Sequence, residues 1–268
     1  MDLQGKTVVV TGGGSGMGRE IVLLLLKKGA RAAAVDINEA ALRETASLAG
    51  DHGGRLTTHA VNITDRDAVA ALPEAVIQAH GAVDGLINNA GIIQPFVRIN
   101  ELDIKDIERV FNVNFWGLVY MTKTFLPHLL QRPEAHIANT SSMGSYLPVP
   151  GQTAYGASKA AVRAFTDGLH SELMETNVHV TTIFPGATAT NITANSGVDT
   201  PGGERAQQRS RMKLTTAADA AEIILKGIEK NQYHVFVGSD AKMMNRFSRI
   251  APERAARFIY SQMRELLD

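Results

Sequence analysis

The sequence predicts an α/β fold in which a parallel sheet of about seven strands carries helices on both faces. Two observations predict it. Short β-branched or alanine-rich runs alternate with longer helical segments along the whole chain, which is the pattern of a parallel sheet with crossover helices. The first run, Lys6–Val10, enters a glycine-rich turn that opens a helix, as in nucleotide-binding sheets. The expected architecture is therefore a three-layer, Rossmann-like fold.

The first half of the chain alternates regularly between strand and helix. Lys6–Val10 is a buried β-branched strand, and the apolar segment Gly16–Lys28 ends at Gly29, a usual signal for a helix C-terminus. A later helix is capped by Thr64 or Asp65. The same pattern predicts strands at Arg31–Val35, Leu56–Val61 and Val83–Ile87, and helices at Asn38–Leu48 and Arg66–His80.

The second half contains the longest helices. Apolar residues at helical spacing run from about Ile104 to Leu130. The segment Tyr155–Glu175 contains good helix formers such as Ala160 and Ala161. The pattern further predicts strands at Ala135–Thr140, Val178–Phe184 and His234–Val237, and a helix at Ala217–Lys230.

We expect a single domain, residues 1–268, because no linker or internal repeat interrupts the pattern. Residues 191–213 are irregular and polar, and such a long stretch in a compact domain is usually a functional lid or a disordered loop. We expect this lid to order over cofactor and substrate and to be mobile without them. Residues 240–268 form a helical C-terminal extension that packs on the domain or on a second subunit, with a membrane surface as the weaker alternative.

Composition excludes several functional classes. The 27 basic and 27 acidic residues balance, so we expect no nucleic-acid partner. The lack of cysteine excludes disulfides, thiolate metal sites and cysteine nucleophiles, and the eight histidines show no metal-ligand spacing, so we expect no metal. The N-terminal residues lack a secretion signal, and no apolar run is long enough to span a bilayer. A cytoplasmic protein is therefore the default expectation.

The glycine-rich turn at residues 11–18 predicts a nucleotide site. Gly12, Gly16 and Gly18 allow a tight turn, and the following helix offers free N–H groups to a pyrophosphate. Asp36 ends the second strand, where a carboxylate binds ribose hydroxyls and repels a 2′-phosphate, although it also precedes a helix that it can cap. Arg19 remains a candidate contact for a 2′-phosphate, so the pattern favours NAD without excluding NADP.

Several short motifs follow in a fixed order over roughly residues 5 to 190. Ser142 lies thirteen residues before Tyr155, and Lys159 completes a Tyr-x-x-x-Lys pair. The others are Asn88-Asn89-Ala90-Gly91, Val113-Asn114, Pro185-Gly186 and Thr190. With the glycine turn, this ordered set resembles the short-chain dehydrogenase/reductase family. The resemblance weakens after Thr190, where the Asp-Gly-Gly segment common in the family is missing, and Asn62 replaces a common Asp.

The resemblance implies a catalytic set. Tyr155 is the acid or base, and Lys159 lowers its pKa and binds the nicotinamide ribose. Ser142 holds the substrate oxygen, and Asn114 keeps a water chain between Lys159 and solvent. From the residues alone, Ser141 rivals Ser142, and a Tyr–Lys pair at this spacing is often plain helix surface. The resemblance further implies that the cofactor is bound by Gly12, Ser15, Gly16, Met17, Gly18, Asp36, Asn62, Ile63, Asn89, Ala90, Gly91, Tyr155, Lys159, Pro185, Gly186, Thr188 and Thr190.

These residues predict an oxidoreductase that moves a hydride between a nicotinamide cofactor and a secondary alcohol or ketone. An ammonium near a phenol favours the phenolate, which suits proton transfer at a carbonyl oxygen. The expected substrate walls at residues 92–95 and 143–148 are mostly apolar, so we expect a medium-sized, mostly apolar substrate. The alternatives are a nucleotide-sensing regulator on the same fold and an NADP-linked reductase of carrier-bound ketones. By the resemblance, the two long helices form the face of a homo-oligomer, a dimer or a tetramer.

Overall fold

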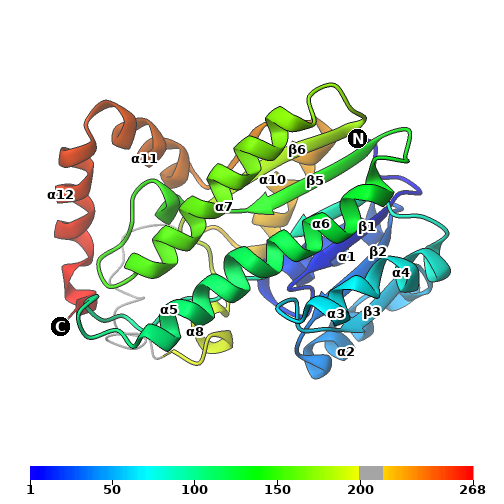
Figure 1. The fold of residues 1–268 in the computed structure, drawn as a ribbon, viewed down its shortest axis with the longest axis horizontal. Coiled ribbons are helices and arrows are strands. Elements are labelled where there is room, and N and C mark those ends of the chain that lie inside the picture. Colours follow the sequence, from blue (N-terminus) through cyan, green and yellow to red (C-terminus); the bar gives the residue numbers. More distant parts are fainter. Residues whose placement is uncertain (199–213, 268) are drawn as a thin grey trace.

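One parallel sheet runs through the molecule (Figure 1). The structure is a computed structural model that describes residues 1–198 and 214–267. Its strands are β1 (Thr7–Thr11), β2 (Arg31–Asp36), β3 (Leu56–Ala60), β4 (Gly85–Asn88), β5 (Ala135–Thr140), β6 (Val178–Pro185) and β7 (His234–Val237). They lie in the order β3-β2-β1-β4-β5-β6-β7, and each neighbouring pair is parallel. The predicted seven-stranded α/β fold is therefore confirmed.

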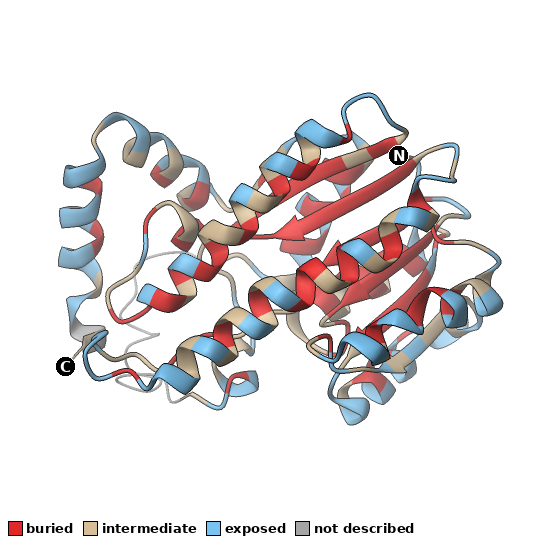
Figure 2. Cartoon of the chain, in the orientation of Figure 1, coloured by how far each residue is buried: buried red, intermediate tan, exposed pale blue. Residues whose placement is uncertain are grey.

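Alternate residues of the central strands face two separate hydrophobic cores. Val8 and Val10 of β1 join one core, whereas Val9 between them joins the other. Helices cover both cores, so the central strands are buried on both faces (Figure 2). This burial explains why β1 is a short apolar run, although β5 also buries polar residues such as His136 and Asn139. The first core is covered by α1 (Gly16–Lys27), α2 (Glu39–Leu48) and α10 (Ala217–Glu229), and the second by α3 (Arg66–Ala70), α4 (Leu72–His80), α6 (Leu118–Leu129) and α7 (Thr153–Glu172).

The remaining helical elements are α5 (Ile104–Phe111), α8 (Ile192–Asn195), α11 (Ser239–Ile250), α12 (Pro252–Met263), the π-helix η2 (Asn112–Gly117) and the 3-10 segments η1 (Gly50–Arg55), η3 (Met143–Ser145) and η4 (Arg264–Leu267).

Three segments that the sequence presents as continuous helices, residues 66–80, 104–130 and 240–268, are divided in the structure. Two divisions occur at proline: Pro73 lies in the first turn of α4 and Pro252 starts α12, where a missing N–H is tolerated. The third is η2, which separates α5 from α6.

The strand order reverses between β1 and β4, at the carboxyl edge of the sheet. Open α/β sheets bind their ligands at such a switch point. The Thr11 hydroxyl at the end of β1 accepts hydrogen bonds from the N–H groups of Asn89 (3.0 Å) and Ala90 (3.1 Å). The glycine turn after β1 and the Asn-Asn-Ala-Gly segment after β4 are thereby held together at one edge.

Two peripheral segments lie near this edge. The helix α8 belongs to the expected lid, of which residues 199–213 lie outside the described residues. The helices α11 and α12 form the C-terminal extension and lie beyond the end of the sheet, beside the start of α7 (Figure 1). They pack on η3 through an apolar cluster that contains Met143, Leu147, Met244, Ala255 and Ile259.

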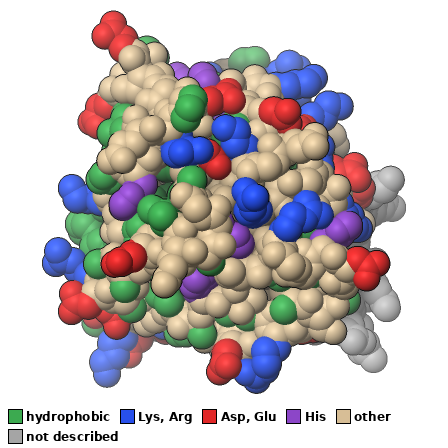
Figure 3. Space-filling view, turned by 90° about the vertical axis from the view of Figure 1, so that its right-hand side faces the viewer, with side chains coloured by type: hydrophobic (Ala, Val, Ile, Leu, Met, Phe, Trp, Pro, Cys, Tyr) green, Lys and Arg blue, Asp and Glu red, His purple; other side chains and the backbone are tan. Residues whose placement is uncertain are grey.

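Surface charges of both signs are intermingled. Acidic and basic side chains lie interspersed across the face drawn in Figure 3, in keeping with their equal totals. Within residues 1–198 and 214–267, no helix combines the length and apolar character needed to cross a membrane. Within the same ranges, no three side chains of His, Asp or Glu gather as a metal site.

Candidate active site

The glycine turn has the backbone shape that the sequence predicts. Gly12 and Gly16 have φ angles of +70° and +51°, a region that side-chain-bearing residues rarely adopt. A Cβ at Gly18 would collide with the carbonyl oxygen of Gly12, so the start of α1 packs directly on the turn. The turn therefore brings backbone N–H groups and the α1 N-terminus to one place, which suits a phosphate.

A cleft of about 420 Å³ opens beside this turn. Eleven of the predicted cofactor residues line it: Gly12, Ser15, Gly16, Met17, Asp36, Asn62, Ile63, Asn89, Ala90, Gly91 and Thr190. Among the described residues, Gly18, Tyr155, Lys159, Pro185, Gly186 and Thr188 are not part of its wall. The cleft thus contains the nucleotide side of the predicted site, and Lys159 of α7 lies against Gly91 in its wall.

Asp36, which lines the cleft, and Arg19, which does not, both have hydrogen-bond partners. The Asp36 carboxylate accepts hydrogen bonds from the N–H groups of Gly14 and Asn38, each at 3.0 Å. The Arg19 guanidinium donates to both carboxylate oxygens of Glu44, at 2.8 and 2.6 Å, and to the carbonyl oxygen of Gly14. The cation that could have contacted a 2′-phosphate is therefore paired with a carboxylate.

The helix α7 positions Tyr155 and Lys159 one turn apart on one face. Lys159 is 3% exposed, and its Nζ donates to the carbonyl oxygen of Thr140 at 2.9 Å and lies 6.0 Å from the centre of the Tyr155 ring. Burial lowers the pKa of Lys159 to about 8. Burial also raises the pKa of Tyr155, and a hydrogen bond with Ser142 partly offsets that rise. The resemblance implies that Lys159 lowers the pKa of Tyr155. In this structure the pKa of Tyr155 is set by burial and by Ser142 instead.

The two candidate serines, Ser141 and Ser142, have different hydrogen-bond partners in the structure. The Ser141 hydroxyl is buried and donates to the carbonyl oxygen of Lys159 at 2.8 Å. The Ser142 hydroxyl accepts from the N–H of Gly144 at 3.0 Å and reaches Tyr155. A Cβ at Gly144 would lie 3.4 Å from the Ser142 hydroxyl and 3.5 Å from the Tyr155 ring, so the loop packs closely on both. Ser142 is therefore the serine that faces the tyrosine.

Asn114 lies in the π-helix η2 and joins three segments. Its amide nitrogen donates to the carbonyl oxygen of Ile92 at 2.9 Å and to the Ser158 hydroxyl at 3.0 Å, and its carbonyl oxygen accepts from the N–H of Ile92 at 2.8 Å. A Cβ at Gly91 would lie 3.1 Å from Lys159 Nζ and 3.2 Å from Asn114 Oδ1. Asn114 and Lys159 thus converge on a wall residue of the cleft.

Comparison with known proteins agrees with this geometry. Residues 6–200 match the family described as short chain dehydrogenase. The chain belongs to the short-chain dehydrogenase family. This result confirms the predicted family and makes the protein an oxidoreductase.

Relatives cover this short-chain dehydrogenase almost from end to end. SadH of Mycobacterium tuberculosis, named an oxidoreductase, is 38% identical over 254 residues, which are 92% of this chain and 91% of SadH. The 3beta-hydroxysteroid dehydrogenase 2 of Eggerthella lenta is 34% identical over 80% of each chain. A short chain dehydrogenase/reductase from Burkholderia phymatum, crystallised in complex with NAD, superposes with a TM-score of 0.86 at 26% identity, covering 95% of this chain and 96% of that one.

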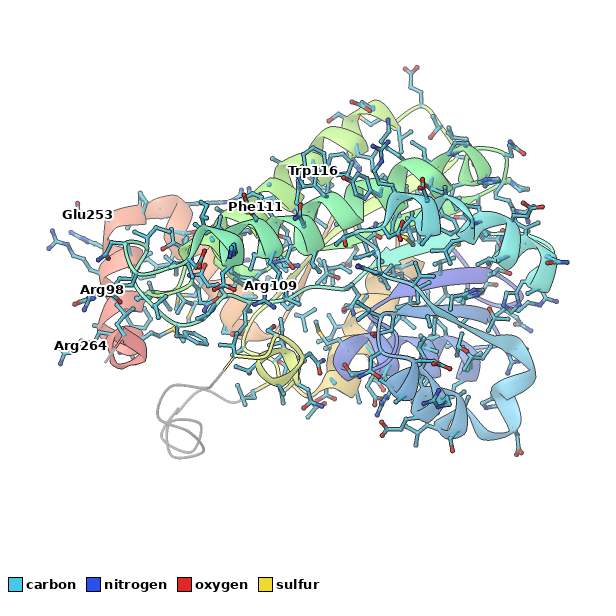
Figure 4. The ribbon with its side chains drawn as sticks, turned by 60° about the horizontal axis from the view of Figure 1, so that its bottom comes forward. Arg98, Arg109, Phe111, Trp116, Glu253 and Arg264 are labelled. Atoms are coloured by element: carbon cyan, nitrogen blue, oxygen red, sulfur yellow. The ribbon has the colours of Figure 1, made fainter. Side chains whose placement is uncertain are left out.

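Some side chains at the site of this dehydrogenase were not predicted as part of it. Asp240 in α11 accepts a hydrogen bond from the N–H of Ala187 at 2.8 Å and lies against Gly186, so it holds the turn after β6. Arg109 points from α5 toward α8, where it donates to the carbonyl oxygen of Ser196 at 3.0 Å (Figure 4). The sequence signal for Asp240 is its place in the first turn of a helix, where an acidic side chain is favourable.

Of the two neighbouring asparagines, only Asn89 lines the cleft. The Asn88 amide is buried and donates to the Thr122 hydroxyl at 3.1 Å and to Asn139 Oδ1 at 2.8 Å. The Asn89 amide donates to the carbonyl oxygen of Thr11. Asn88 therefore ties β4 to its neighbours, and Asn89 is the candidate cofactor residue.

Proposed function

We propose that this dehydrogenase transfers a hydride between NAD(H) and a secondary alcohol or ketone of medium size and mostly apolar character. The observation that carries the proposal is the convergence of Ser142, Tyr155 and Lys159 next to the nucleotide cleft. Gly91 joins the two regions, because it lines the cleft and lies against Lys159 Nζ. A proton donor and a hydride donor would thus be adjacent, as carbonyl reduction requires.

The proposed chemistry gives each side chain one task. Bound NADH supplies the hydride. In reduction, the Tyr155 hydroxyl donates its proton to the carbonyl oxygen, which the Ser142 hydroxyl holds by a hydrogen bond. Lys159 and Asn114 replace that proton from solvent through water. Because burial raises the pKa of Tyr155, the phenol is protonated at neutral pH, which suits the reductive direction.

The cofactor-binding residues divide by the part of NAD that they suit. Gly12, Ser15, Gly16, Met17 and Gly18 suit the pyrophosphate, because they carry free N–H groups at a helix N-terminus. Asp36 suits the adenosine ribose. The remaining proposed contacts are Asn62, Ile63, Asn89, Ala90 and Gly91 on the adenosine side, and Tyr155, Lys159, Pro185, Gly186, Thr188 and Thr190 on the nicotinamide side.

Asp36 and Arg19 support NAD over NADP. The Asp36 carboxylate at the end of β2 would repel a 2′-phosphate, and Arg19 is already paired with Glu44. The relative from Burkholderia phymatum was crystallised with NAD, which is consistent with this preference.

Asp36→Ser is expected to shift the cofactor preference toward NADP. It removes the charge that repels a 2′-phosphate, and one hydrogen bond to a charged group contributes roughly 1.5–3 kcal/mol. The ratio of kcat/KM with NAD to kcat/KM with NADP should therefore fall about 10- to 100-fold. Asp51→Ser, at an exposed carboxylate of η1, should leave the ratio unchanged. An unchanged ratio in Asp36→Ser means that Asp36 does not set the preference.

The experiment that tests the proposed activity is a panel of secondary alcohols and ketones with both cofactors. The predicted substrate walls at residues 92–95 and 143–148 are mostly apolar, and the Eggerthella relative is named for a steroid. We expect turnover of medium-chain ketones or steroid ketones, followed by the absorbance of reduced cofactor. Turnover confined to carrier-bound ketones with NADPH supports the alternative function, an NADP-linked reductase of carrier-bound ketones. No turnover with any of them contradicts the proposal and favours a nucleotide-sensing role.

We further propose a homo-oligomer that pairs through the outer face of α5, η2 and α6. Trp116 is 46% exposed there and stacks on Tyr120 with the ring centres 6.1 Å apart. Phe111 and Trp116 lie on the side of this helical segment away from Arg109 (Figure 4). A second copy would remove this aromatic surface from water. The mass of the protein in solution tests this proposal.

A further inference from the structure

Gln94 is a fully buried amide beside the catalytic helix. It lies in the loop after β4, at 0% exposure, and its sequence position suggested only a place in the substrate wall. A polar side chain this deep is unfavourable unless its hydrogen-bonding groups are paired. The partners of Gln94 therefore indicate what the residue does.

All of its polar side-chain bonds go to the start of α7. The Gln94 side-chain oxygen accepts from the N–H groups of Ala154 (2.7 Å) and Tyr155 (3.0 Å). Its side-chain nitrogen donates to the carbonyl oxygen of Gly151 at 2.9 Å. In return, the Gln152 side chain donates to the Gln94 carbonyl oxygen at 2.8 Å. The loop and the helix start are thus tied by four hydrogen bonds.

This arrangement replaces a missing local cap. The first N–H groups of a helix have no partner within the helix, and a side chain at the residue before it usually accepts from them. In α7 that residue is Gln152, whose side chain makes no such bond. Gln94, about sixty residues earlier in the sequence, caps α7 instead, and one of the two capped N–H groups belongs to Tyr155 itself.

The residues next to Gln94 bond to other parts of the site. Ile92 makes two backbone hydrogen bonds to the Asn114 side chain. The N–H of Ile93 donates to the Ser196 hydroxyl at 3.0 Å, beside α8. Three consecutive residues therefore connect the cleft wall, the segment after α8 and the catalytic helix, so the position of Gln94 is fixed from both sides.

We propose that Gln94 is a positioning residue that caps α7 and thereby holds the Tyr155 hydroxyl against Ser142. The inference rests on the proposed role of Tyr155 as proton donor. A reacting group displaced by about 1 Å can lose about 10²-fold in rate. Loss of the cap lets the first turn of α7 shift while the cofactor cleft, which Gln94 does not line, stays intact.

Gln94→Met tests the inference, because it keeps the size of the side chain and removes both hydrogen-bonding groups. We expect kcat with NADH and the best ketone of the panel to fall 10- to 100-fold, with NADH affinity, measured by fluorescence, within twofold of the wild type. The ascending limb of the pH profile for alcohol oxidation, in which Tyr155 acts as the base, should move to higher pH, because Tyr155 loses the hydrogen bond with Ser142 that lowers its pKa. A simple loss of folding would instead weaken NADH binding along with kcat and would leave this limb in place.

Two further variants serve as controls. Gln152→Met breaks the reverse hydrogen bond between the same two segments and leaves the Tyr155 N–H capped, so its kcat should stay within threefold of the wild type. Gln94→Glu keeps an acceptor for both N–H groups and should restore most of the activity lost in Gln94→Met. If Gln94→Met proves insoluble, Gln94→Asn retracts the amide by one methylene and should show the same loss.

Three outcomes overturn the inference: Gln94→Met keeps kcat within twofold, Gln152→Met loses as much, or Gln94→Glu is no better than Gln94→Met. Failure of the proposed function looks different. In that case Tyr155→Phe itself keeps near-normal turnover. A Tyr155→Phe variant without turnover beside a normal Gln94→Met variant overturns only the positioning role.

Discussion

Tyr155→Phe is expected to lower turnover by about 10²- to 10⁴-fold and to leave cofactor affinity unchanged. The substitution removes only the hydroxyl group, so the ring keeps its packing against Gly144. The variant lacks the hydroxyl that, in the proposed mechanism, donates the proton to the carbonyl oxygen. The measurements are kcat from the absorbance of the reduced cofactor and the dissociation constant of NADH from fluorescence.

Tyr260→Phe is the matched control for this variant. Tyr260 is an exposed tyrosine of α12, so the loss of its hydroxyl should change neither kcat nor NADH affinity. The assignment of Tyr155 is wrong if Tyr155→Phe turns over at a rate close to that of Tyr260→Phe. Loss of NADH binding together with turnover would instead show that the hydroxyl supports the cofactor site rather than the proton transfer.

Most of the sheet is predictable because its signal is local. Strands such as β1 and β2 are buried on both faces along most of their length, so their sequences are short apolar runs bounded by turns. The π-helix η2 has no such signal, since the apolar spacing of the segment 104–130 continues through it. Its cause is tertiary: Asn114 bonds to the backbone of Ile92, twenty-two residues earlier. The sequence alone does not show that Asn114 and Ile92 come together in the fold.

The same distinction applies to the site. Tyr155 and Lys159 are readable because a helix fixes their spacing, and Asp36 because it ends a strand. The cap on α7 is not readable, because Gln94 and the Tyr155 N–H come together only through the fold. The pairing of Arg19 with Glu44 was likewise open from sequence, and it engages the cation that could have contacted a 2′-phosphate. Long-range hydrogen bonds thus account for what the sequence leaves undecided.

Lys159→Met is expected to abolish most turnover and yet to stabilise the fold at neutral pH. Lys159 is almost fully buried, and burial lowers its pKa from 10.5 to about 8. A shift of that size corresponds to about 3 kcal/mol of unfavourable free energy for the protonated form in the folded state. Methionine removes the charge, and the lost hydrogen bond from the ammonium to the Thr140 carbonyl offsets roughly 1.5 kcal/mol or more of the gain. The proposed catalytic role of Lys159 therefore comes at a cost in stability.

The sign of the effect follows from proton binding. Between pH 8 and pH 10.5 the unfolded chain binds the Lys159 proton and the folded protein does not, so the wild type gains stability as pH rises through this window. Below pH 8 both states are protonated and the full penalty applies. The variant has no such group, so its advantage over the wild type should be greatest at neutral pH and shrink steadily as pH approaches 10.5.

The measurement is the free energy of unfolding of both proteins in urea, in the absence of nucleotide, at neutral pH and near pH 10. We expect Lys159→Met to be more stable by about 1–2 kcal/mol at neutral pH, and nearly equal to the wild type at the higher pH. Lys226→Met, at an exposed lysine of α10, should change stability by less than about 0.5 kcal/mol at either pH. A Lys159→Met variant that is less stable than the wild type at neutral pH would mean that the ammonium is better paired than its single hydrogen bond to Thr140 indicates.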